Sequence, residues 1–303
     1  MDEGLEIAQV ARELAAIDFV VFAGAGTCSG TGIPDWKPFL RALHNKRPVS
    51  GMNPEEVEEW NYPELAQMIY NEYEQADDIH GYYAALNEEL RARISPYSPV
   101  QLSIVYCTPK VITVNFDDCF DKAYETYFSR EGMNKTLRVQ ILPDLDKKLL
   151  DDGHLLTCIH GKISTENIVF TTREYERNYN LDNHKNPRPL EEFLGHIYWT
   201  HSIVFVGVSF NDKYMVRALE NIVKRGKTEE SVDKPKVVAM KESERKCRHY
   251  AFLQTGVKQE QQRNERLSGI GIRPILYREH AEVVRCLDLV HKIRLMPKVV
   301  VEQ

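Results

Sequence analysis

The feature that most constrains this chain is a glycine-rich turn that directly follows an apolar run near its start. Residues 17–22 are rich in β-formers, and residues 23–36 read AGAGTCSGTGIPDW. An apolar run that ends in small residues predicts a first strand and a loop whose backbone N–H groups can approach a phosphate. The spacing Gly24-x-Gly26-x-x-x-Gly30 is not the G-x-G-x-x-G of a dehydrogenase. It is not a Walker loop either, because no Gly-Lys-Ser/Thr follows.

The composition places the chain among soluble globular proteins. It has 303 residues, of which 43% are hydrophobic and 28% charged, enough for one large domain or two modest ones. The net charge of −6 argues against a broad nucleic-acid surface. No apolar stretch is long enough to cross a bilayer, and the acidic start lacks a signal-peptide core. A cytoplasmic location is therefore expected, with no membrane contact and no direct nucleic-acid binding.

The six cysteines do not form any C-x-x-C pair. A zinc ribbon is therefore not predicted, and no metal is expected. Scattered single cysteines in a cytosolic protein are typically reduced and buried. Cys28, inside the glycine loop, either fills a turn or lines a site.

Alternating strand and helix patterns predict an α/β fold. Further strands are expected at 111–114, 155–159, 203–206, 236–240 and 272–277, and helices at 5–15, 118–128, 212–224 and 282–294. The near-continuous apolar strands are typical of a parallel sheet covered on both faces. We therefore predict a Rossmann-like, doubly wound parallel sheet. Residues 37–100 are expected to form a small helical insertion or lid, and residues 101–295 the remainder of the core. The polar run 241–266 is interpreted as a surface helix or excursion.

Polar residues follow several of the predicted strands. Asn115 and Asp117 follow one strand, His160 another, and Gly207 and Ser209 a third. Doubly wound sheets bind ligands outside the carboxyl ends of their strands. These clusters and the glycine loop are therefore expected to meet at one rim of the sheet.

Taken together, the four segments resemble the sirtuin superfamily, and its bacterial SIR2-like branch more closely than the protein deacylases. Residues 24–26 and 32–36 look like the GAG…GIP motif, and residues 113–117 like the T-Q-N-[IV]-D motif. His160-Gly161 followed by IVFT at 168–171 and Glu174-Tyr175, and VFVGVSFND at 204–212, occur in the family order. The resemblance covers roughly residues 18–220 and implies a single SIR2-like domain over residues 1–303.

Three departures bear on the chemistry. Val114 stands where the deacylase motif has glutamine, Lys37 replaces the usual arginine, and the zinc-binding cysteine pairs are absent. Each weighs against acyl-lysine peptide chemistry. The resemblance thus implies an NAD hydrolase of bacterial antiphage defence, which uses NAD as substrate and depletes it in the infected cell. A sirtuin-type protein deacylase and a non-catalytic NAD or ADP-ribose sensor are the alternatives.

The resemblance also implies roles for individual residues. His160 is expected to bind the nicotinamide-ribose hydroxyls and act as general base, Asn115 to hold the ribose or position water, and Asp117 to receive the nicotinamide amide. Alternatively, Asp117 or Asp118 is the N-cap of the helix expected at 118–128. Cofactor contacts are expected from Gly24, Ala25, Gly26, Ser29, Thr31, Ile33, Pro34, Asp35, Trp36, Gly207 and Ser209. Asp212 is interpreted as a helix cap.

An ungated NAD hydrolase would kill its host. Because the chain contains no evident sensor domain, control is expected from a homo-oligomer or from a partner protein. The resemblance suggests a separately encoded HerA-type ATPase, with a prokaryotic Argonaute as the alternative. The preference between NAD and NADP stays open.

Overall fold

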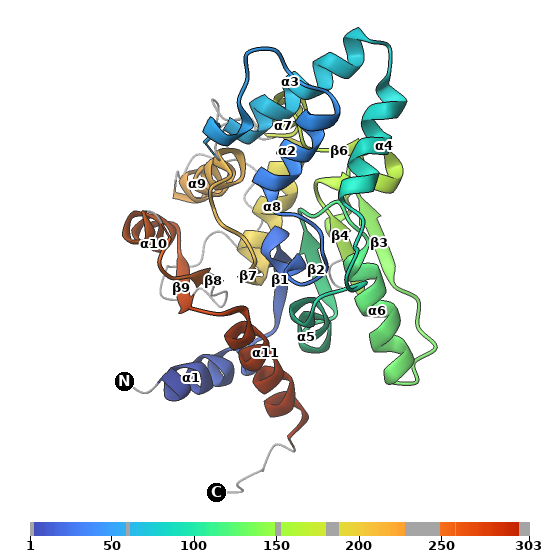
Figure 1. The fold of residues 1–303 in the computed structure, drawn as a ribbon. Coiled ribbons are helices and arrows are strands. Elements are labelled where there is room, and N and C mark those ends of the chain that lie inside the picture. The colour runs from blue at the N-terminus through green and yellow to red at the C-terminus, as the bar shows by residue number, and fades with distance from the viewer. Residues whose placement is uncertain are drawn as a thin grey trace, which may run out of the picture.

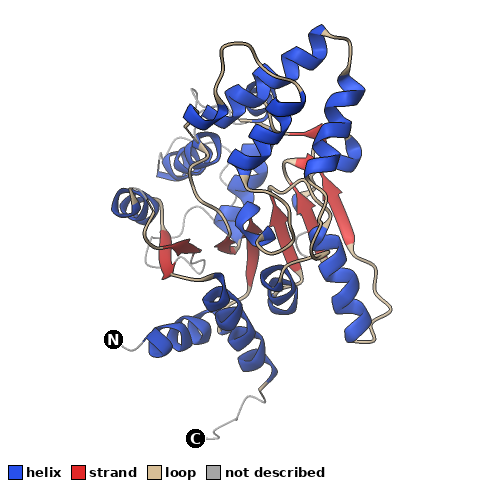
Figure 2. Ribbon diagram, viewed as in Figure 1, coloured by secondary structure: helices blue, strands red, loops and turns tan. Residues whose placement is uncertain are grey.

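The computed structural model describes residues 3–58, 61–148, 153–179, 188–227, 249–257 and 259–296. The strands of its main sheet are β1 (Phe19–Ala23), β2 (Lys110–Thr113), β3 (Arg138–Ile141), β4 (Leu155–Cys158), β7 (Ser202–Val206), β8 (His249–Gln254) and β9 (Ile272–Tyr277). The helices that cover it are α1 (Glu3–Ala15), α5 (Pro99–Cys107), α6 (Cys119–Arg130), α7 (Thr172–Asn178), α8 (Pro189–Thr200), α9 (Lys213–Lys227), α10 (Glu260–Gly269) and α11 (His280–Leu295). Figure 1 shows their arrangement, and Figure 2 shows the helices on both sides of the sheet.

The central sheet has seven strands in the order β3-β4-β2-β1-β7-β8-β9. Every neighbouring pair is parallel, with Val21 opposite Val111 on one side and Val204 on the other. From β1 the chain passes to β2, then to β3 at the edge, and then to β4, which lies between β2 and β3. It later builds β7, β8 and β9 on the other side of β1. The topological switch point therefore lies between β1 and β7, where such sheets bind ligands. The predicted Rossmann-like α/β class is confirmed.

Each face of the sheet has its own apolar core. On β1, Val20 and Phe22 belong to the cluster covered by α7, α8 and α9, while Phe19 and Val21 belong to the cluster covered by α1, α5, α6 and α11. This alternation follows from the two-residue period of a strand. Because both faces are buried, the strands read as continuous apolar runs rather than alternating ones.

A third apolar cluster lies over the carboxyl edge of the sheet. It is formed by α2 (Trp36–Lys46), α3 (Tyr62–Gln75) and α4 (Ile79–Glu89), which stand above the strands in Figure 1. Phe116 and Phe170, from the sheet side, pack into the same cluster. Aromatic residues from both parts thus join these helices to the strand ends. The proposed division into residues 37–100 and 101–295 stays a prediction.

Two strands depart from the sequence predictions. β3 was not predicted, because it is a short edge strand paired only with β4 and has Arg138 and Val139 exposed. β8 lies inside the polar run 241–266, where we expected a surface helix or excursion, and that interpretation is wrong for residues 249–254. Five of its six residues are buried between β7 and β9. The strand expected at 236–240 lies outside the described residues.

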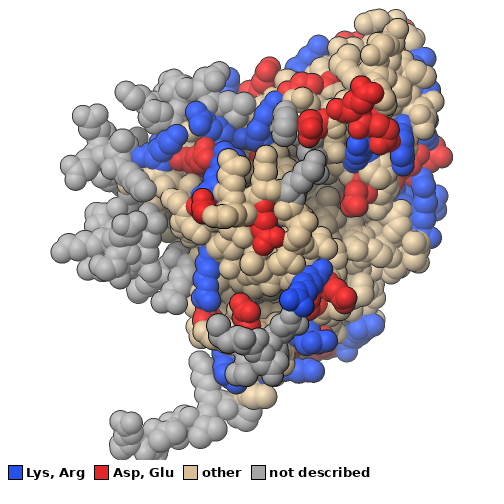
Figure 3. All heavy atoms as spheres, turned by 60° about the vertical axis from the view of Figure 1, so that its left-hand side comes forward, with Lys and Arg blue, Asp and Glu red and all other residues tan. Residues whose placement is uncertain are grey.

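None of the helices in the described ranges combines the length and the apolar character that spanning a membrane requires. On the face drawn in Figure 3, basic and acidic side chains are interspersed over the described residues. This mixture of signs matches the small net charge of −6.

Candidate functional site

A cavity of about 610 Å³ opens along the carboxyl edge of the sheet, at the switch point. Residues at or just beyond the ends of β1, β2, β4, β7, β8 and β9 line it. The sequence-predicted residues in its lining are Gly24, Ala25, Gly26, Ile33, Pro34, Asp35, Trp36, Asn115, Asp117, His160, Gly207 and Ser209. The expected convergence of separate segments on one rim therefore occurs.

Ser29 and Thr31 are not among the lining residues. Ser29 is exposed, whereas Thr31 is buried and its hydroxyl donates to the Cys28 carbonyl at 2.7 Å. The carbonyl of Thr31 accepts hydrogen bonds from the backbone of Arg93 and Ile94. Thr31 therefore holds the glycine loop to residues 93–94 and does not line the cavity.

The glycine loop after β1 and the turn after β7 are packed backbone to backbone. Gly24 N donates to Val206 O at 2.9 Å, and Gly26 N donates to Gly207 O at 3.0 Å. A Cβ on Gly24 would lie 2.6 Å from Gly207 O, and a Cβ on Gly207, whose φ is +67°, would lie 2.4 Å from Thr27 N. These glycines are required by the contact between the two loops. Because two of the three predicted phosphate donors already donate to β7 and the turn after it, the pyrophosphate cradle predicted for residues 24–26 stays a prediction.

Asn115 joins the end of β2 to the glycine loop. Its Nδ2 lies 3.3 Å from Gly24 O, 3.2 Å from Thr27 Oγ1 and 3.3 Å from Cys28 Sγ. The side chain is buried but lines the cavity. Within the described part of the chain its Oδ1 accepts no hydrogen bond. The amide therefore orders the loop through its nitrogen and offers its oxygen to a ligand.

His160 stands at the base of the cavity against two tyrosines. Its Nε2 is 2.6 Å from Tyr179 Oη, and its ring meets Tyr175 edge-on at 5.4 Å. The side chain is 2% exposed, and desolvation lowers the pKa of His160 to about 3. The imidazole is therefore neutral at pH 7 and acts as a hydrogen-bonding group.

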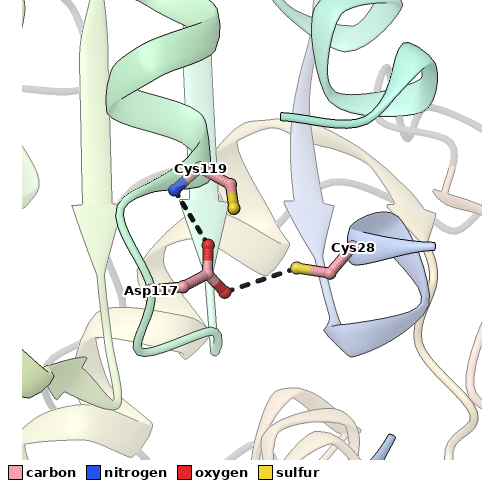
Figure 4. Close-up of side chains that lie close together, drawn as sticks. All are labelled: Cys28, Asp117 and Cys119. Atoms are coloured by element: carbon pink, nitrogen blue, oxygen red, sulfur yellow. Dashed lines mark hydrogen bonds between the residues drawn. The ribbon is translucent and has the colours of Figure 1, made fainter. Parts of the chain in front are cut away.

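The N-cap residue of α6 is Asp118, whose side chain makes no cap hydrogen bond. Asp117, the residue before it, accepts from Cys119 N at 2.9 Å through its Oδ1. Its Oδ2 accepts from Cys28 Sγ at 3.3 Å. Figure 4 shows the side chains of Cys28, Asp117 and Cys119 directed toward one another. Their ligand atoms all lie within 4.8 Å of each other, a set that could hold a metal ion. Desolvation raises the pKa of Asp117.

Aromatic side chains line the end of the cavity next to the helical insertion. Trp36 stacks on Phe170 with ring centroids 5.3 Å apart, and it meets Phe116 edge-on at 6.3 Å. Asp35, the residue before α2, is exposed and makes no side-chain cap hydrogen bond. Asp35 and Trp36 therefore both face the cavity from the mouth of the insertion.

Asp212 caps the first turn of α9, as the sequence predicted. Its Oδ1 accepts from Tyr214 N at 2.8 Å and from Met215 N at 3.1 Å, and its Oδ2 accepts from Tyr175 Oη at 3.0 Å. Asp212 also lines the cavity. A chain of contacts thus runs from α9 through Tyr175 to His160.

Several lining residues were not predicted from the sequence. The opposite end of the cavity is lined by Gln254, Arg263, Tyr277 and His280, which come from β8, α10, β9 and α11. Arg263 donates to Gln254 O at 3.2 Å, and desolvation lowers its pKa. Because β8 was not predicted from the sequence, this end of the cavity was not predicted either. Tyr179 gave no signal, because its contact with His160 spans 19 residues without a motif.

The fold and the cavity define a Rossmann-like protein with a candidate ligand site at the switch point of its sheet. The family comparison is more specific: residues 109–275, more than half of the chain, match the SIR2-like domain family. The chain belongs to this family. The matched segment starts just before β2 and includes Asn115, Asp117, His160 and Gly207. No curated protein matches the chain. Membership connects the site with NAD-related function and with a family that is commonly enzymatic.

Proposed function

We propose that this protein is an NAD⁺ glycohydrolase, which cleaves NAD⁺ to nicotinamide and ADP-ribose. The observation that carries the proposal is the convergence of Asn115, Asp117 and His160 on one cavity in a SIR2-like chain. The cavity extends from the aromatic end at Trp36 to the polar end at Arg263. An elongated dinucleotide would place its nicotinamide at the first end and its adenosine at the second.

The reaction breaks the bond between ribose C1′ and the nicotinamide nitrogen. The electron pair leaves with nicotinamide, C1′ develops oxocarbenium character, and water adds to C1′ with loss of a proton. A site for this chemistry must orient the ribose and stabilise positive charge. Asn115 and Asp117 both line the cavity. The Asn115 oxygen, which accepts no hydrogen bond within the described residues, and the Asp117 carboxyl group, which accepts from Cys119 N and Cys28 Sγ, are suited to that task.

The environment of His160 refines its role in the proposal. A neutral imidazole bonded to Tyr179 is suited to hydrogen bonding a ribose hydroxyl. Its low pKa, about 3, makes it a weak general base in the ligand-free structure. We therefore assign His160 primarily to ribose binding, and the proton that the attacking water loses passes to bulk solvent.

The deciding experiment resolves the products after NAD⁺ is incubated with wild type, Asn115→Ala and His160→Ala. We expect nicotinamide and ADP-ribose from wild type and a loss of at least about 100-fold in rate from each variant. Arg266→Ala, on the surface of α10, is the matched control and should retain the wild-type rate. O-acyl-ADP-ribose from an acylated peptide would indicate a deacylase instead, and NAD binding without turnover would indicate a sensor.

The biological setting is also part of the proposal. We place the enzyme in the cytoplasm in antiphage defence, where NAD depletion stops the infected cell. Its activity is then gated by a homo-oligomer or by a separately encoded HerA-type ATPase, with a prokaryotic Argonaute as the alternative. Full activity of a monomer, measured by sedimentation and product formation at the same concentration, would contradict gating.

A further inference from the structure

Three ligand-type side chains from two distant segments meet beside the proposed NAD site. Cys28 comes from the glycine loop after β1, and Asp117 and Cys119 come from the turn that begins α6. Their exposed fractions are 5%, 8% and 0%. The two sulfurs and a carboxylate oxygen lie within 4.8 Å of one another, and Figure 4 shows the side chains converging.

Neutral hydrogen-bond donors surround the cluster. Cys28 Sγ is the acceptor for two amide groups, Asn115 Nδ2 at 3.3 Å and Gln101 Nε2 at 3.5 Å. Asp117 Oδ1 is fixed by Cys119 N, which leaves Oδ2 directed at the sulfurs. Within the described residues no lysine or arginine pairs with Asp117. The negative charge of this buried carboxylate is thus met by neutral donors alone, and burying such a charge is costly.

We propose that Cys28, Asp117 and Cys119 bind a thiophilic divalent cation, with Zn²⁺ as the favoured ion. Two thiolates and one carboxylate form a ligand set that zinc accepts in tetrahedral geometry, and thiolates select zinc over magnesium or calcium. The amides of Asn115 and Gln101 would act as the outer hydrogen-bond donors that orient metal-bound ligands. Three protein ligands leave one coordination position, which water or a cavity ligand would fill.

The proposed metal site would lie beside the proposed NAD site. Metal binding there would not require that the protein cleaves NAD. Cys28 and Asp117 line the cavity, and Asn115 contacts both the cluster and the glycine loop. A bound ion would hold the glycine loop to the turn before α6, two segments that both line the cavity. The proposal goes beyond NAD cleavage and is tested by metal binding itself.

The test titrates the reduced, metal-free protein with Co²⁺, and then displaces Co²⁺ with Zn²⁺. We expect one equivalent of Co²⁺ with thiolate-to-metal charge-transfer absorption, which Zn²⁺ abolishes at the same stoichiometry. Cys28→Ser and Cys119→Ser should each weaken binding by more than about tenfold. Cys286→Ser, another buried cysteine remote from the cluster, is the matched control and should bind as wild type does.

Circular dichroism establishes that each variant is folded. If a cysteine variant does not fold, Asp117→Asn provides the same test, because it keeps the shape of the side chain and removes its charge. Absence of charge-transfer absorption in wild type would overturn the proposal. So would absorption that persists in Cys28→Ser and Cys119→Ser, or a Cys28–Cys119 disulfide that survives the reducing buffer. None of these readouts uses NAD, so they are independent of the proposed hydrolase activity.

Discussion

At the scale of single residues, His160 shows how burial changes a role that sequence alone assigns. The family resemblance implied that this histidine, which follows a predicted strand, binds the nicotinamide-ribose hydroxyls and acts as general base. The structure surrounds the ring with Tyr175 and Tyr179 and lowers its pKa to about 3. Position was predictable, because strand ends meet at one rim. The protonation state was not, because it depends on the burial of the ring by distant segments of the chain, among them those of Tyr175 and Tyr179.

The pKa of His160 predicts acid sensitivity. An unfolded histidine titrates near 6.5, so between about pH 6.5 and about pH 3 the unfolded chain binds one more proton at this position. Acid therefore lowers the free energy of unfolding by at most about 1.4 kcal/mol per pH unit. In urea unfolding between about pH 6.5 and about pH 4.5, His160→Gln should lose stability less steeply than wild type.

His80→Gln, at an exposed position, is the control and should follow the wild-type profile. Parallel pH profiles for wild type and His160→Gln would show that the folded protein protonates His160 as readily as the unfolded chain does.

The cysteines also show that the role of a residue depends on neighbours that only the fold brings to it. Spacing along the chain excluded a zinc ribbon, and that argument applies only to ligands that are neighbours in sequence. Cys28 and Cys119 are 91 positions apart and meet because β1 and β2 are adjacent parallel strands. Their proximity requires the strand order, which the sequence pattern alone did not provide.

At the scale of elements, the loops after β1 and β7 form one unit. The predicted reason for Gly24 and Gly26 was approach to a phosphate, whereas the structure uses both for contact with Gly207. β3 and β8 were missed for a related reason. The pattern of buried and exposed residues in β3 reflects its place at the edge of the sheet, and that of β8 reflects its place between two other strands. A short stretch of sequence does not show which strands will be its neighbours.

This contact predicts unequal effects for two glycine substitutions. Gly207→Ala introduces both a positive φ of +67° and a Cβ 2.4 Å from Thr27 N, and should cost about 3 kcal/mol or more and weaken NAD binding. Gly256→Ala has a similar φ of +78°, but among the described residues a Cβ there meets no atom within 4 Å. It should cost only about 1 kcal/mol.

Chemical denaturation and NAD titration of both variants check this prediction. Equal losses of stability would mean that the backbone conformation, rather than the contact with the glycine loop, sets the requirement at position 207.

At the scale of the whole molecule, the cavity joins elements from both halves of the sheet. A ligand that spans it should stabilise the fold as a unit, by about 2.7 kcal/mol at a concentration 100 times its Kd. We expect NAD to raise the unfolding temperature of wild type, and to raise it less in Arg263→Ala because that side chain lines the polar end. Arg266→Ala, on the same helix but paired with Glu220, should respond as wild type does.

Thermal unfolding with and without NAD measures the effect. An equal NAD response in Arg263→Ala and wild type would place the dinucleotide away from the α10 end of the cavity.

The interlocked glycines also determine where this binding site can change. Main chain forms part of the cavity lining, since a side chain at position 24, 26 or 207 would clash with the opposite loop. Substitutions cannot reshape that part without separating β1 from β7. Selectivity for one ligand over another therefore depends on the side chains of the remaining lining, among them Trp36, Arg263 and His280. A search for variants with altered ligand preference should start at those side chains and leave the glycines intact.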